Sequence, residues 1–82
     1  MDDLDRIQDE LLARIDGAAD PAALEALRIA TLGRSGRITA MMKDIGSLDA
    51  DSRRAAGQAL NAVKNAVSDA IAARKSAFDA AA

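Results

Sequence analysis

The 82-residue sequence contains no cysteine and no histidine, and Phe78 is its only aromatic residue. A chain without these residues has no disulfide, no thiol nucleophile, no zinc site built on them and no imidazole base. No apolar run approaches the ~18 residues of a membrane-spanning helix. The N-terminus carries Asp2, Asp3 and Asp5 where a signal peptide would be basic. We therefore expect a cytoplasmic chain with no membrane partner, no metal or cofactor site, and no enzymatic activity by itself.

Proline and glycine are scarce as well, with one and five residues, whereas alanine occupies 21 of the 82 positions. Valine, isoleucine, threonine and aromatic residues are too few for sheets, and they never alternate with polar residues. This composition predicts an all-α fold in one domain. Because alanine is small, and because so short a chain buries only ~60–65% of its unfolded surface, the core should be thin.

Apolar residues recur at helical spacing in successive segments, which predicts a lead-in helix over residues 1–18 and a helix over 20–32. A break between them is favoured over a bend, because Asp20-Pro21 combines an N-cap residue with a first-turn proline. Residues 33–48 form the expected tip with a short helix, and residues 49–82 the long returning helix, capped by Ser47 or Asp49. The apolar stripe of that last helix is Ala56, Leu60, Val63, Val67, Ile71, Arg74 and Phe78.

The glycines divide the chain at specific points. Gly33 and Gly36 stand three residues apart and predict a helix stop and a hairpin tip. Gly57 lies inside a good helical pattern, where it costs ~1 kcal/mol relative to alanine. The close approach of another backbone near the tip would explain it.

The shape and the charge distribution follow from the long helix. Its 34 residues would measure ~50 Å, too long for a ball of ~12 Å radius of gyration. We therefore predict an elongated antiparallel helical hairpin or coiled coil. The charge balance is −6 over residues 2–25, +3 over 26–48 and +1 over 49–82. The turn should be the basic end, and the open end with the N-terminus the acidic one. A single seam buries little area, so we also expect self-association.

Three groups of residues resemble one known family. Residues 24–39 end in Leu32-Gly33-Arg34-Ser35-Gly36-Arg37-Ile38-Thr39, which is similar to the LG(K/R)xGxLT signature of bacterial phenylalanyl-tRNA synthetase alpha subunits. Met41-Met42-Lys43 resembles the short helix that follows in that family. Gly57, Asn61, Lys64 and Arg74-Lys75 resemble its returning-helix pattern. The match covers residues 20–80.

The resemblance implies a helical arm that contacts tRNA(Phe), in a ligase whose catalytic domain uses ATP and Mg²⁺ and works with a beta subunit. By position, the expected tRNA contacts are Arg34, Arg37, Lys43 and Lys64. Ser35 stands where the family often has a second lysine. No residue corresponds to the aminoacylation site, so we expect an excised domain whose partners include the rest of the alpha subunit.

A second interpretation remains open from the residues themselves. The same helices could form a protein–protein interaction hairpin that buries its apolar stripe against a partner and has no role with RNA. The charge of +3 over residues 26–48 favours the RNA interpretation, because phosphate backbones are bound through lysine and arginine.

Overall fold

The computed structural model describes residues 2–81 and is helical almost throughout, with no strand in that range. The helices are α1 (Asp2–Asp16), α2 (Pro21–Leu32), α3 (Arg37–Asp44), the 3₁₀ helix η1 (Ile45–Ser47) and α4 (Ala50–Ala81). The molecule measures 48 × 22 × 15 Å. The 32 residues of α4 span ~48 Å, so this one helix sets the length of the molecule. The predicted all-α, elongated fold is confirmed.

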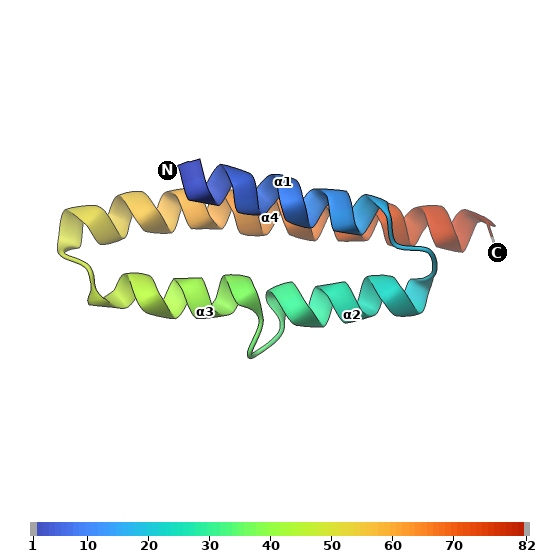
Figure 1. Ribbon diagram of the computed structural model, residues 1–82, viewed down its shortest axis with the longest axis horizontal. Helices are drawn as coiled ribbons and strands as arrows, with labels where there is room; N and C mark the ends of the chain where they lie inside the picture. Colours follow the sequence, from blue (N-terminus) through green and yellow to red (C-terminus); the bar gives the residue numbers. More distant parts are fainter. Residues whose placement is uncertain (1, 82) are drawn as a thin grey trace.

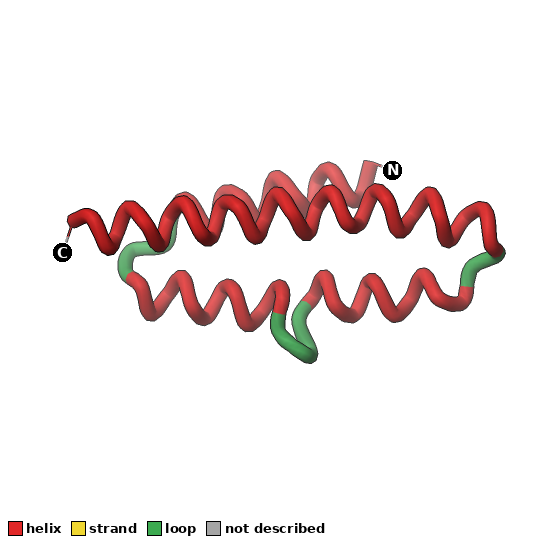
Figure 2. Tube along the Cα trace, turned by 180° about the vertical axis from the view of Figure 1, so that it is seen from behind, coloured by secondary structure: helices red, strands yellow, loops and turns green. Residues whose placement is uncertain are grey.

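The helices form three rows (Figure 1). α2 and α3 lie end to end in one row and run antiparallel to α4. The chain passes from this row to α4 through η1. The α2–α3 row and α4 together form the expected helical hairpin. α1 forms a third row beside α4 and runs parallel to it, as the view from behind also shows (Figure 2). The α1–α2 turn and the η1–α4 turn therefore lie toward opposite ends of the rod.

The apolar stripe of α4 is the spine of the core. Its first five predicted residues are buried and the last two, Arg74 and Phe78, are half-buried. A flank of alanines beside this stripe faces α1, since Ala70 and Ala73 line the same hollow as Leu12 and Ile15. Because alanine is small, it allows the axes of the two helices to come close. The abundant alanine therefore serves helix–helix contact.

Arg74 fastens the α1–α2 turn to α4. One of its guanidinium nitrogens donates a hydrogen bond of 2.9 Å to the carbonyl oxygen of Ala18, which is itself buried. The same guanidinium lies 4.6 Å from the centre of the Phe78 ring, within the range of a cation–π interaction. A charged residue near the C-terminal end of the apolar stripe thus holds two distant segments together.

The helix starts agree with the capping pattern of the sequence. The Asp20 carboxylate accepts a hydrogen bond of 2.7 Å from the backbone nitrogen of Ala23, and Pro21 is the first helical residue. At α4 the Asp49 carboxylate accepts from the nitrogen of Ser52 at 2.8 Å. Of the two expected caps, Asp49 is therefore the one used.

The structure corrects the expected placement of the charges along the rod. Because the chain reverses at residues 17–20 as well as at η1, the N-terminus lies in the same half of the molecule as the η1–α4 turn (Figure 1). Leu4 and Ile7 share a hollow with Ile45 and Ala56, which confirms this placement. The acidic residues of α1 lie along one side of the rod, so the acidic open end predicted from the sequence is wrong.

The expected tip at Gly33 and Gly36 is also misplaced: the two residues form a loop partway along the rod (Figures 1 and 2). Their φ angles of −67° and −70° are open to any residue. The surrounding space, however, leaves no room for a side chain. A Cβ on Gly33 would lie 2.5 Å from the carbonyl oxygen of Ile29, and a Cβ on Gly36 would lie 2.5 Å from the carbonyl oxygen of Thr31. A Cβ on Gly57 would meet only the side chain of Ile45, at 3.7 Å. The backbone contact expected there is absent.

Replacing Gly36 by alanine should therefore destabilise the domain by about 1–3 kcal/mol, because the added methyl group overlaps rigid backbone. Gly46→Ala is the matched control, since a Cβ there meets nothing within 4 Å. The control should be neutral or stabilising by ~0.4–1 kcal/mol, through the reduced entropy of the unfolded chain. Urea unfolding measures both. Equal stability of the two variants would contradict this assignment of the loop.

Candidate nucleic-acid interface

The loop between α2 and α3 bulges away from α4 (Figures 1 and 2). The Gly36 nitrogen donates to the Gly33 carbonyl oxygen at 2.9 Å, which closes a turn. The Thr39 hydroxyl donates to the same oxygen at 2.8 Å. Arg34 and Ser35, between the two glycines, are exposed. Two hydrogen bonds to the Gly33 carbonyl oxygen therefore brace the loop, and the side chain of Arg34 is exposed on it.

Arg37 begins α3 and lies beside an acidic residue of α1. Its side chain is 45% exposed, and one guanidinium nitrogen is 3.7 Å from a carboxylate oxygen of Glu10. Glu10 also accepts a hydrogen bond of 3.0 Å from Arg14, one turn along α1. Exposed ion pairs of this kind contribute little to stability. Glu10 nevertheless offsets part of the positive charge at this predicted contact.

Lys64 and Lys43 are exposed on different helices. Residue 57 of α4 is level with Ile45, as the 3.7 Å separation from its side chain indicates. Antiparallel helices have equal rises, so Lys64, seven residues onward, is level with residue 38. Lys64 and Arg37 thus lie at the same height on the rod. Lys43 lies ~9 Å nearer the η1 end, so it stands apart from the other three predicted contacts.

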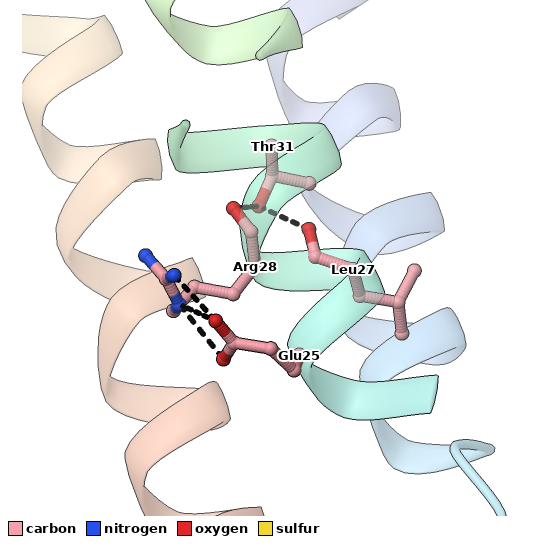
Figure 3. A network of polar contacts seen from close by, with 4 residues as sticks. All are labelled: Glu25, Leu27, Arg28 and Thr31. Carbon is pink, nitrogen blue, oxygen red and sulfur yellow. Dashed lines mark hydrogen bonds and ion pairs between the residues drawn. The ribbon is translucent and has the colours of Figure 1, made fainter. Parts of the chain in front are cut away.

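Arg28 is a charged residue near this surface that the sequence analysis did not assign (Figure 3). Its Nε donates to both carboxylate oxygens of Glu25, at 3.0 and 2.9 Å. This hydrogen bond is the main cause that holds the pKa of Glu25 below its ordinary value, with a smaller contribution from the charge of Lys75 on α4. The three-residue spacing on one helix could have revealed the pair.

Thr31 stabilises the last turn of α2 before the loop (Figure 3). It is buried, and its hydroxyl donates to the carbonyl oxygen of Leu27 at 2.8 Å. A buried hydroxyl is satisfied in this way without another polar partner. The helix end that carries the basic loop is therefore fixed from inside.

Neither an acidic metal-binding cluster nor a membrane-spanning helix is found among the described residues. Within residues 4–81 no three acidic side chains gather in a way that could hold a metal ion. No helix among them is long and apolar enough to cross a membrane. The exposed basic residues around the α2–α3 loop therefore remain the candidate site.

Comparison with known proteins assigns residues 19–82 to a family model described as "Aminoacyl tRNA synthetase class II, N-terminal domain". The phenylalanine–tRNA ligase alpha subunit of Rhizobium etli is 45% identical over the whole chain, which covers 23% of that protein. The corresponding subunit of Phenylobacterium zucineum is 47% identical over 99% of the chain and 22% of its own length. The chain thus spans about a quarter of these relatives. No solved structure matches it.

The Glu25–Arg28 pair should make stability depend on pH in a defined direction. Because the pKa of Glu25 is lower in the folded state, its contribution is present above the ordinary value of 4.5 and is lost as the pH falls through the lowered value. The urea midpoint of Glu25→Gln should be below that of wild type at neutral pH, and the difference should vanish in acid. Arg28→Gln should behave alike. A difference that stays constant with pH would refute the role of this pair.

Proposed function

Because this chain belongs to the family of class II aminoacyl-tRNA synthetase N-terminal domains, we propose that it is the tRNA-binding arm of a phenylalanine–tRNA ligase alpha subunit. The relatives that match it over its full length carry that subunit's name. In this proposal the arm holds tRNA(Phe) in position while the aminoacylation is carried out elsewhere in the enzyme.

The exposed basic loop is the observation that supports the proposal most directly. Gly33 and Gly36 allow a tight turn that no larger residue fits, and Arg34 is exposed between them. Arg37 and Lys64 lie at the same height, so three positive charges face solvent around one section of the rod. Lys43 extends this surface toward η1. Lysine and arginine on a rigid support bind phosphates by displacing condensed counterions.

The contacts should position the RNA without reading its bases. The single aromatic residue, Phe78, is half-buried and lies under the guanidinium of Arg74. It is 14 residues from Lys64, or ~21 Å along α4. The loop therefore has no aromatic side chain on which an unpaired base could stack. Phosphate contacts fix the register of a nucleic acid but carry little sequence information.

The remaining parts of the reaction are assigned to other parts of the enzyme. ATP and Mg²⁺ would be bound by a catalytic domain, and the partners of this chain would be the rest of the alpha subunit and the beta subunit. A cytoplasmic location follows from that role. The residues of this chain then contribute binding and orientation only.

Two exposed apolar residues bear on a second candidate, the protein–protein interaction hairpin. Ile29 on α2 is 54% exposed and Leu48, before α4, is 42% exposed. Large apolar side chains at the surface are typical of contacts with other proteins when they cluster. These two lie in different segments. The expectation of self-association assumed a hairpin of two helices with an uncovered apolar face. In the structure α1 already covers the alanine flank of α4, so less apolar surface is left for a second copy.

The double variant Arg34→Ala/Arg37→Ala should weaken binding to cognate and non-cognate tRNA about equally. Each phosphate interaction that the substitutions remove should reduce the slope of log affinity against log salt by roughly 0.7–0.9. A salt titration with both tRNAs measures this.

The matched control is Arg6→Ala/Lys75→Ala, which removes the same charge at exposed positions outside the loop. Its slope should stay close to that of wild type. An unchanged slope in the loop variant, or weakening confined to the cognate tRNA, would contradict the proposal.

Glu10→Gln should strengthen binding of the same tRNAs. The substitution removes the carboxylate 3.7 Å from Arg37 and leaves the guanidinium free to meet a phosphate. The gain should be greatest at low salt, because the competing pair is exposed and screened by ions. Asp9→Asn, on the same helix with an exposed side chain, is the charge-matched control. Equal gains in both variants would show that only net charge matters.

A further inference from the structure

Gly57 is a glycine that the fold itself does not require. It lies inside α4, where glycine is a poor helix former. Its φ is not positive, and an added Cβ would meet only the terminal methyl of Ile45 at 3.7 Å, an ordinary contact distance. Alanine therefore fits at this position and should form a better helix. Packing within the domain gives no reason for the glycine.

The surface around Gly57 is polar and positively charged. Residues 52–68 contain no acidic residue. At four residues per step, Arg53 and Asn61 lie one turn on either side of Gly57, and Lys64 follows on the same flank. All three side chains are exposed. Asp51 and Asp69, which border the segment, lie about 120° away from Gly57 around the helix.

This flank lies at the same height along the rod as the basic loop. Lys64 is level with the start of α3, where Arg37 lies, and Gly57 is level with Ile45 nearer the rod end. From Lys64 to Arg53 the flank extends ~17 Å along α4. A strand that follows this flank toward η1 therefore meets no acidic side chain of residues 52–68.

We propose that Gly57 is the point at which the sugar–phosphate backbone of bound RNA approaches α4 most closely. Gly57 is partly exposed beside Ile45, and the lack of a Cβ lets a ligand come closer to the helix backbone there. Arg53, Asn61 and Lys64 supply the charged and amide groups that commonly bind phosphates. The inference rests on the proposed tRNA binding and adds a second contact region, distinct from the α2–α3 loop. The inference explains why a glycine, which is a poor helix former, stands at position 57 of α4.

The test separates stability from binding at one position. Gly57→Ala should raise the melting temperature by ~4–8 °C, because alanine favours the helix, and yet weaken binding to tRNA. Gly57→Leu should weaken it further and reduce the salt slope by roughly 0.7–0.9, the share of one phosphate. Ala62→Leu, an exposed site on the other flank, is the matched control and should bind as wild type does.

Two results would overturn the inference while the proposed function stands. Gly57→Leu could bind tRNA as tightly as wild type, in a preparation where Arg34→Ala/Arg37→Ala reduces the slope. Alternatively, Gly57→Ala could lower the melting temperature, which would show that the glycine serves the fold. A wild-type chain without salt-dependent tRNA binding would overturn both proposals together.

Discussion

The packing of two separate rows against one long helix is the constraint on which this domain depends. α4 presents a buried stripe that includes Leu60, Val63 and Val67, and beside it a flank of alanines. α1 packs on the alanine flank, and the α2–α3 row packs on the other side of the stripe. The two rows contact each other much less than they contact α4. The rod is therefore as long as α4, and the surface loops are positioned by it.

This arrangement distributes charge across the rod. The exposed acids of α1 lie along one row, whereas Arg34 and Lys43 lie on another, and α4 carries an acid-free flank beyond them. Arg37 is the point where the two regions meet, through Glu10. A polyanion is repelled by the α1 side and attracted by the other. Under the proposed function, the side of the rod that carries the α2–α3 loop is the surface that contacts RNA.

The sequence predicted those features that depend on local spacing and failed where distant segments meet. The α4 stripe, the Asp20 cap and the break at Gly33 follow from residues within a turn or two, and the structure has all three. The direction in which α1 runs could not be predicted in this way, because a periodic stripe shows which side of a helix is buried but not which other helix covers it. The Arg37–Glu10 pair was missed for the same reason. The role of the four predicted contact residues still rests on resemblance and exposure.

The contact between Arg74 and Ala18 joins residues 56 positions apart in the chain. Most of the packing of α1 is likewise with α4, the last helix within residues 2–81. During synthesis on the ribosome, α1, α2 and α3 therefore emerge before the surface that buries them exists. A nascent chain that has not yet reached α4 lacks its main packing partner. The domain can complete its fold only when its final helix has left the exit tunnel.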